Sequence, residues 1–362
     1  MSIFFKLEKK LSKLLDPRQQ FAYTEIESEI RYDPLTRDTA RICHFAGIVP
    51  QSEDLDALLE ATRAHCPFCE QQVARITPKF TPEFLRGLPD ADAAATDDAG
   101  SLVRDGRLVR GEATLFPNLF PYDEISAIAV ISRAHAWDAQ AMPAQAIADA
   151  IMLARDFFIH ARQTSDTLAA AYGLLTWNYL PASGGSQLHP HMQVALSQHP
   201  GNRLARELNA EGAYQAATGS TYAGDLVQAE RDGARWLMED ATAAWLVPFA
   251  PLGVLGDVMA VFHQKSAIEE LNDAEIAEFS VSLTRMISYF AKNGLSSFNL
   301  SFFPDAPSDA SGRHRLTARL LPRFYLNNAL HVSDSSYLQL LLQEAFCMRF
   351  PEALADQMRK AL

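Results

Sequence analysis

One short stretch, residues 186–193, constrains this chain more than any other. It reads Ser-Gln-Leu-His-Pro-His-Met-Gln and runs into three apolar residues, 194–196, a continuation that predicts a β-strand. Side chains alternate between the two faces of a strand, so we expect His189, His191 and Gln193 on one face. The sequence therefore predicts three polar side chains that converge on one site.

A histidine pair of this kind has two chemical uses. Neutral imidazole is a nucleophile and also a common metal ligand. The alternative is that both histidines are hydrogen-bonded core residues. The preceding loop, Ser183-Gly184-Gly185, favours a phosphate site, because small residues let a phosphate approach the backbone closely. Pro190 cannot donate a ladder hydrogen bond, which places the strand start at an edge or beside such an irregular loop.

Composition limits the classes of ligand and partner. The chain has 362 residues, is 48% hydrophobic and carries a formal net charge of −12, which is enough apolar material for one large or two modest cores. An acidic chain without a basic tract is a poor nucleic-acid binder, so we expect only small, locally held phosphate ligands. No stretch is long and apolar enough to span a bilayer. The four cysteines show no disulfide framework, which predicts a cytoplasmic protein.

Residues 1–24 are expected to form a separate amphipathic helix. From Met1 to Leu15, phenylalanines and leucines are mixed with lysines at helical spacing. No uninterrupted apolar core or cleavage site follows, so a signal peptide is not predicted. We expect this helix to pack on the body of the protein, with a weak membrane-surface role as the alternative.

A second motif, Cys66-Pro67-Phe68-Cys69, precedes the histidine pair. A Cys-x-x-Cys pair is either redox-active or metal-binding, and Pro67-Phe68 gives little support to a thioredoxin-like helix start. A structural zinc ion needs two further ligands. The strand-like segment 127–131 ends in Ser132-Arg133-Ala134-His135, and a lone loop histidine there is otherwise expected to face solvent.

These pieces together resemble the galactose-1-phosphate uridylyltransferase family, the nucleotide-transferring branch of the histidine-triad superfamily. The resemblance rests on His-Pro-His-x-Gln after the glycine loop, on Cys-Pro-Phe-Cys, and on Arg-x-Asp-Pro-Leu-Thr at residues 31–36. It implies a structural zinc ion held by Cys66, Cys69, His135 and His189. It also implies a homodimer.

The same resemblance implies roles for individual side chains. His191 is the expected nucleophile, and Gln193 is the amide that assists transfer; in this family glutamine goes with transferases and histidine with hydrolases. Donors at the glycine loop are expected to bind the phosphate oxygens where charge develops. Taken alone, Asn118 is equally a turn residue that caps a strand. The expected substrate-binding residues are Arg31, Asn118, Asn178, Gly184, Gly185, Ser186 and Gln193.

The order of the expected elements predicts the fold. Strand, helix 144–161, strand 172–179 and the His-Pro-His strand have counterparts in strand 258–262, helix 273–292, strand 297–302 and segment 315–322. We therefore predict an α+β protein of tandem histidine-triad-like repeats, with largely antiparallel sheets flanked by helices. Residues 25–205 form the first unit, with the zinc and the active site, and residues 206–362 a degenerate second unit.

The repeat also indicates where chemistry is absent. Arg315 and Thr317 stand where the first unit has His189 and His191. Some members of the family carry an iron site in this place. We predict no iron site and no second metal site in this chain.

Three functions are compatible with the resemblance. The first is a nucleotidyltransferase of carbohydrate metabolism, of the galactose type. It moves a nucleoside monophosphate between a nucleoside diphosphate sugar and a hexose 1-phosphate through a nucleotidyl-histidine, which predicts ping-pong kinetics. The second is a phosphorylase of an ADP-sugar or a diadenosine polyphosphate. The third is a non-catalytic, zinc-stabilised nucleotide-binding protein.

Overall fold

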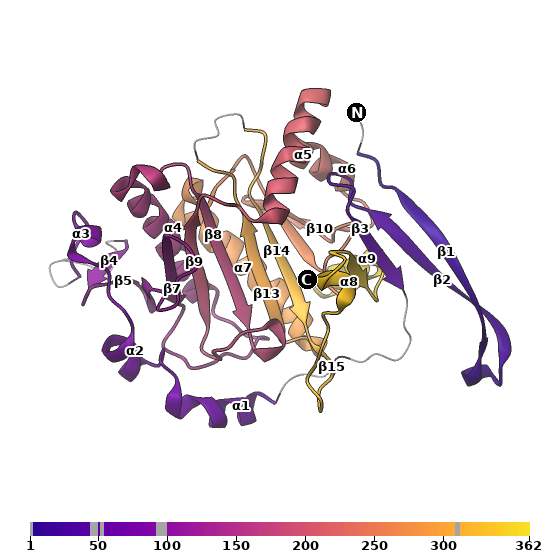
Figure 1. The fold of residues 1–362 in the computed structure, drawn as a ribbon, viewed down its shortest axis with the longest axis horizontal. Helices are drawn as coiled ribbons and strands as arrows, with labels where there is room; N and C mark the ends of the chain where they lie inside the picture. Colours follow the sequence, from indigo (N-terminus) through magenta and orange to yellow (C-terminus); the bar gives the residue numbers. More distant parts are fainter. Residues whose placement is uncertain (1–2, 44–49, 51–53, 92–99, 308–311) are drawn as a thin grey trace.

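The computed structural model describes residues 3–43, 50, 54–91, 100–307 and 312–362. Within these residues the central element is an antiparallel sheet of 11 strands, in the order β10-β11-β12-β14-β13-β8-β9-β7-β6-β5-β4 (Figure 1). The strands of the first half are β4 Leu102–Arg104, β5 Arg107–Arg110, β6 Ala113–Pro117, β7 Ile125–Val130, β8 Tyr172–Tyr179 and β9 His191–Ser197. Those of the second half are β10 Trp236–Glu239, β11 Ala243–Leu246, β12 Val258–Phe262, β13 Ser297–Phe303 and β14 Thr317–Arg323.

The sheet has an internal repeat centred on the β8–β13 pair. Moving outward, β8 is followed by β9, β7, β6 and β5, whereas β13 is followed by β14, β12, β11 and β10. In the chain, α4 (Ala144–Thr164) connects β7 to β8, and α7 (Asp273–Lys292) connects β12 to β13. This arrangement confirms the predicted α+β fold, in which tandem repeats build largely antiparallel sheet flanked by helices.

The main apolar core lies between the sheet and its two long helices. α4 and α7 lie side by side on one face, and burial of their apolar stripes stabilises them (Figure 1). Met192 and Val194 of β9 belong to this core. Because side chains alternate along a strand, His191 and Gln193 lie on the opposite face.

The opposite face is covered differently in the two halves. In the second half, Tyr222 and Leu226 of α6 (Tyr222–Glu230) form an apolar cluster with strand residues that include Val261. In the described part of the first half, a small cluster that contains Phe116 and Val130 lies there, with Phe68 packed against it. The connecting helices are α1 Leu55–Thr62, α2 Glu70–Ile76, α3 Pro82–Leu85 and α5 Asn202–Thr218.

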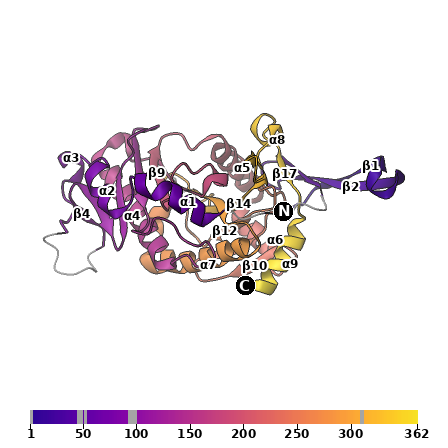
Figure 2. The ribbon, with the colours of Figure 1, turned by 90° about the horizontal axis from the view of Figure 1, so that it is seen from below.

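The predicted N-terminal helix is wrong. Residues Leu7–Asp16 form β1, which pairs antiparallel with β2 (Ala22–Tyr32) at every position and projects from the body as a hairpin (Figure 2). Leu7, Leu11 and Leu15 fit a helical stripe, but their odd numbering also places them on one face of a strand. The cross-strand ion pair of Lys9 with Glu27 then favours the hairpin.

The hairpin belongs to a small sheet that joins the two ends of the chain. Its order is β1-β2-β3-β17, with β3 at Thr39–Cys43 and β17 at Ala345–Cys347. The remaining C-terminal elements are β15 Tyr325–Asn327, β16 Val332–Ser333, α8 Tyr337–Leu340 and α9 Pro351–Ala361. Residue 205, the predicted boundary between units, lies inside α5, and the division into units stays a prediction. Among the described residues, every helix is too short or too polar to cross a membrane.

Candidate functional site

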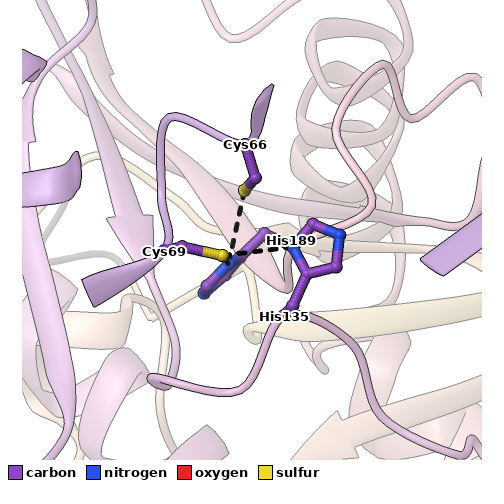
Figure 3. A group of neighbouring side chains, drawn as sticks. All are labelled: Cys66, Cys69, His135 and His189. Carbon is purple, nitrogen blue, oxygen red and sulfur yellow. Dashed lines mark hydrogen bonds between the residues drawn. The ribbon is translucent and has the colours of Figure 1, made fainter. Parts of the chain in front are cut away.

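Four predicted metal ligands meet beside the start of β9. Cys66 and Cys69 come from the turn before α2, His135 from the loop after β7, and His189 from the approach to β9 (Figure 3). Their ligand atoms all lie within 4.8 Å of one another. The structure thus brings together side chains from three separate segments of the chain.

The separations of these atoms suit a tetrahedral metal ion. Sγ of Cys66 lies 3.6 Å from Nδ1 of His189, and Sγ of Cys69 lies 3.3 Å from Nδ1 of His135 and 3.8 Å from Nδ1 of His189. In a tetrahedral zinc site with ordinary bond lengths, sulfur and nitrogen are about 3.5 Å apart. Two thiols and two imidazoles are also a donor set that zinc prefers.

Hydrogen bonds on the far side of each ring set its tautomer. Nε2 of His189 lies 2.8 Å from the carbonyl of Ser132, which can only accept, so Nε2 carries the proton. Nε2 of His135 lies 2.9 Å from the hydroxyl of Thr62, whose single proton is donated to the carbonyl of Leu58. Both rings therefore direct an unprotonated Nδ1 towards the thiols, as metal ligands require.

Burial adjusts the protonation of these ligands. It lowers the pKa of His189 to about 4 and also lowers the pKa of His135, so both imidazoles are neutral near pH 7. Burial, together with the neighbouring Cys66, raises the pKa of the Cys69 thiol to about 11. A metal ion must therefore displace the thiol proton of Cys69 when it binds.

His191, the predicted nucleophile, is held in one tautomer by its own chain. Its Nδ1 donates to the carbonyl of His189 at 2.8 Å. Among the described residues, no hydrogen bond engages its Nε2. Burial lowers the pKa of His191, and the ring of Phe68 packs on it with centroids 5.2 Å apart. The residue is thus a neutral imidazole with an available Nε2.

A cavity of about 220 Å³ is lined by Phe68, whose ring packs on this imidazole. Its lining combines apolar residues, such as Val73 and Val109, with charged residues of both signs, such as Arg104 and Glu112. Val130 is the β7 partner of His191 in the ladder. Pockets that combine an apolar surface with placed polar groups are typical sites for small organic molecules.

Gln193 lies on the same face of β9 and has a partner that sequence reasoning missed. The hydroxyl of Tyr122 donates to Oε1 of Gln193 at 2.9 Å. Burial raises the pKa of Tyr122, which keeps the hydroxyl protonated. Because its oxygen is engaged, Gln193 presents Nε2 as a donor. A tyrosine in a loop 71 residues away in the chain gives no local signal of this contact.

The glycine loop is a tight turn. The N–H of Gly184 donates to the carbonyl of Pro181. Gly184 has a φ of 84°, a left-handed conformation that favours glycine at this position. A Cβ at Gly185 would approach the carbonyls of Asn178 and Leu180 to 3.2 Å. Ser186 is exposed and has no hydrogen bond among the described residues. The substrate roles of these residues stay predictions.

The predicted asparagines lie at two different places. Nδ2 of Asn118 lies 3.5 Å from the hydroxyl of Ser126, and its Oδ1 accepts from the N–H of Phe120, so the residue does stabilise the turn before β7. Asn178 lies at the end of β8 and accepts a hydrogen bond from Asn299 of the second half.

Arg31 occupies a different environment. It lies on β2, is buried, and donates to Glu29 at 2.7 Å and to both oxygens of Glu352 on α9 at 2.9 and 3.0 Å. Within the part of the chain that the structure describes, it makes no contact with His191 or with the glycine loop. Its substrate role also stays a prediction.

Comparison with known proteins shows what the fold is similar to. A GalT-like protein of Arabidopsis thaliana has a TM-score of 0.66 and 16% identity, over 92% of this chain and 99% of that chain. An ADP-glucose phosphorylase of Arabidopsis thaliana, with bound ADP-glucose, has a TM-score of 0.69 and 15% identity over the same shares. A uridylyltransferase has a TM-score of 0.62 and 17% identity, over 92% of this chain and 97% of that chain. The chain therefore has the GalT-like fold.

Sequence comparison adds a relative of undefined activity. An uncharacterized protein of Archaeoglobus fulgidus is 27% identical over 338 residues, which are 92% of each chain. No protein-family model matches the chain.

Proposed function

We propose that this chain, which has the GalT-like fold, is a nucleotidyltransferase that works through a covalent nucleotidyl-His191. The observation that carries the proposal is the state of that imidazole: its Nδ1 is committed to the His189 carbonyl at 2.8 Å and its Nε2 is available. We propose a nucleoside diphosphate sugar as donor and a hexose 1-phosphate as acceptor. A cytoplasmic homodimer is part of the same proposal.

The reaction has two displacements at the α-phosphorus. In the first, Nε2 of His191 forms a bond to phosphorus, and the bond from phosphorus to the bridging oxygen breaks, so that the sugar phosphate leaves with the electron pair. In the second, a phosphate oxygen of the acceptor forms the new bond and the phosphorus–nitrogen bond breaks, which restores neutral His191. One difficult step is thereby divided into two easier ones.

The surroundings of His191 support this chemistry. Gln193, held by Tyr122, offers an amide donor towards a non-bridging oxygen, and such a donor is typically worth about 3 kcal/mol in the transition state. The apolar part of the cavity lining, which includes Phe68 and Val130, suits a nucleoside. An imidazole that is neutral at pH 7 needs no base to act as a nucleophile.

We propose that Cys66, Cys69, His135 and His189 hold a structural zinc ion. With four protein ligands the ion has no open position, so it supplies no Lewis-acid chemistry and instead fixes the chain at His189. The carbonyl of His189 is the group that orients His191. The ligand His189 and the nucleophile His191 thus lie in one short segment, so a metal ion that fixes His189 also holds His191 in place.

The first test is covalent labelling. The protein is incubated with UDP-glucose or ADP-glucose carrying ³²P at the α-phosphorus, and acid-labile, base-stable label is measured on the wild type and on His191→Ala. His199→Ala, at an exposed histidine close to the end of β9, is the matched control. We expect label on the wild type and on the control, and none on His191→Ala.

The acceptor is tested on the labelled enzyme. Release of the label by a hexose 1-phosphate but not by inorganic phosphate supports the transferase, and the reverse result supports a phosphorylase. A folded, zinc-loaded wild type that takes up no label from either donor would refute the proposal in favour of a nucleotide-binding role.

A further inference from the structure

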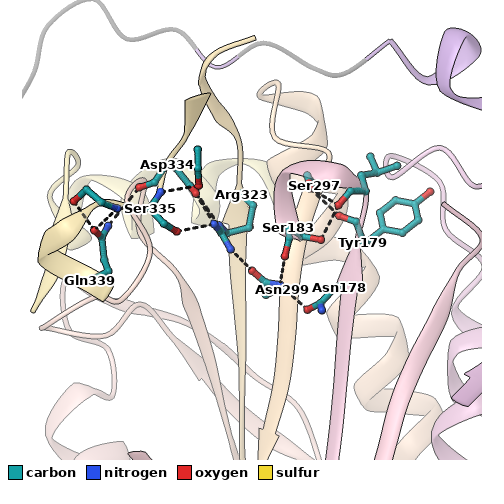
Figure 4. A network of polar contacts seen from close by, with 12 residues as sticks. Asn178, Tyr179, Ser183, Ser297, Asn299, Arg323, Asp334, Ser335 and Gln339 are labelled. Carbon is teal, nitrogen blue, oxygen red and sulfur yellow. Dashed lines mark hydrogen bonds and ion pairs between the residues drawn. The ribbon is translucent and has the colours of Figure 1, made fainter. Parts of the chain in front are cut away.

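A chain of hydrogen bonds joins the second half of the molecule to the end of β8 (Figure 4). Asp334 is buried and accepts from Nε and Nη2 of Arg323 on β14. Nη1 of Arg323 donates to Oδ1 of Asn299 on β13 at 2.6 Å. Nδ2 of Asn299 then donates to Oδ1 of Asn178 at 2.6 Å and to the carbonyl of Ser183 at 3.0 Å.

The donor–acceptor direction of these hydrogen bonds is fixed by the first donor, Arg323. A guanidinium group has only N–H donors, so the atom of Asn299 that faces Arg323 must be Oδ1. The amino group of Asn299 therefore faces Asn178, which accepts its hydrogen bond with Oδ1. The remaining end of the Asn178 amide is its amino group, which donates to no acceptor among the described residues.

Strand register places Asn178 beside the nucleophile. In the β8–β9 ladder, Thr176 is opposite Gln193 and Trp177 is opposite Met192. The next step of the same register puts Asn178 opposite His191, and side chains opposite each other on adjacent strands lie about 5 Å apart at Cβ. Asn178 thus shares the face of the sheet that carries His191 and Gln193.

We propose that Asn299 and Arg323 are positioning residues for the transfer reaction, which orient Asn178 so that it donates to a phosphate oxygen of the substrate held at His191. The inference rests on the proposed function and extends it to residues of the half that has Arg315 and Thr317 in place of His189 and His191. Asn299 has a second part in the same task, because its bond to the Ser183 carbonyl holds the turn that leads to Gly184.

The sharpest variant is Asn299→Asp, which keeps the size of the side chain and removes its donors. The introduced carboxylate still accepts from Arg323 but now faces Oδ1 of Asn178 with a lone pair. The Asn178 amide must rotate to donate to it, which turns a carbonyl oxygen towards the substrate phosphate. Asn299→Ala removes the support without this reversal, and Asn209→Asp, at an exposed position on α5, is the matched control for the added charge.

The measurement is the single-turnover rate of nucleotidyl-His191 formation against donor concentration. A misplaced substrate group slows a reaction by up to about 100-fold. We therefore expect the labelling rate at saturating donor to fall about 10-fold in Asn299→Ala and about 100-fold in Asn299→Asp. The donor concentration that gives half of the maximal rate should change by less than about threefold in Asn299→Ala. Thermal unfolding and zinc content, measured on the same samples, must match those of Asn209→Asp.

A double-mutant cycle separates positioning from a general effect on the fold. If Asn299 acts through Asn178, Asn299→Ala in an Asn178→Ala background should cost no more than about threefold, the part carried by the Ser183 turn. Full additivity, or a labelling rate in Asn299→Asp equal to that of Asn209→Asp, would overturn the inference while leaving the proposed function intact. A wild type that is not labelled at all overturns both.

Discussion

The hydroxyl of Thr62 is the best place to test how the metal site is built. It accepts a hydrogen bond from Nε2 of His135 at 2.9 Å and donates to the Leu58 carbonyl at 2.7 Å. Thr62→Val replaces the hydroxyl with a methyl group of nearly the same shape. His135 then loses the acceptor that holds the proton on Nε2, so its Nδ1 is no longer committed to the metal.

Two independent magnitudes converge on the expected effect. A hydrogen bond between neutral groups contributes about 1 kcal/mol net, and loss of a partner behind a ligating histidine lowers metal affinity by about 10- to 100-fold. We therefore expect zinc binding to weaken about tenfold, equivalent to about 1.4 kcal/mol. His135→Ala, which removes the ligand itself, should lose far more.

The assay is competition for zinc with a chromophoric chelator at fixed pH. Thr164→Val is the matched control, because Thr164 makes the same kind of bond, to the Ala161 carbonyl at 2.7 Å near the end of α4, and faces no ligand. If Thr62→Val binds zinc as tightly as Thr164→Val, then His135 is not held through Thr62. The tautomer assigned to that ring would then be wrong.

Three other predictions concern the same molecule. Tyr122→Phe removes the donor to Gln193 and should slow labelling of His191 about three- to tenfold, as one neutral hydrogen bond predicts; an unchanged single-turnover rate would show that Gln193 orients itself. Zinc affinity should rise with pH between 6 and 8, because burial raises the pKa of Cys69 to about 11 and its proton must leave; a pH-independent affinity would contradict a thiolate ligand. Burial raises the pKa of Glu352, but the hydrogen bonds from Arg31 outweigh this and lower it. Its contribution to stability should therefore be complete above its ordinary pKa of 4.5 and disappear as the pH falls through the lowered value. Urea unfolding should accordingly show Glu352→Gln less stable than the wild type by about 1–3 kcal/mol at pH 7 and the gap closing in acid, whereas a gap that persists at low pH would refute the ionic role.

The sequence predicts this fold well wherever local pattern and tertiary structure agree. The helix expected at 273–292 is α7, and the strand expected at 172–179 is β8, with the same bounds. The helix predicted for the N-terminal segment was wrong because the leucines there fit the period of a helix and that of a strand equally well. Only the presence of a partner strand, with Leu7 opposite Arg31 and Asp16 opposite Ala22, decides between the two.

The site divides in the same way. The clustering of Cys66, Cys69, His135 and His189 could be predicted because their residue types and order match a known motif. The catalytic role of His191 stays a prediction. The contacts of Tyr122 with Gln193 and of Asn299 with Asn178 could not be predicted, because the partners lie far apart in sequence. Asn299 and Asn178 are 121 residues apart, and only the register of β8 against β13 brings them together.

The pairing of β8 with β13 makes residues of one repeat neighbours of the proposed active site in the other. Residues 176–179 of β8 pair with residues 298–301 of β13. The seam between the repeats is therefore made of backbone hydrogen bonds within one sheet, rather than of side chains packed between two separate sheets. The half without a His-x-His pair therefore places Asn299 beside Asn178, on the face of the sheet that carries His191. We therefore expect substitutions along this seam to affect both halves. In this molecule, we expect residues of the half without a His-x-His pair to adjust the reactivity of the half that has one.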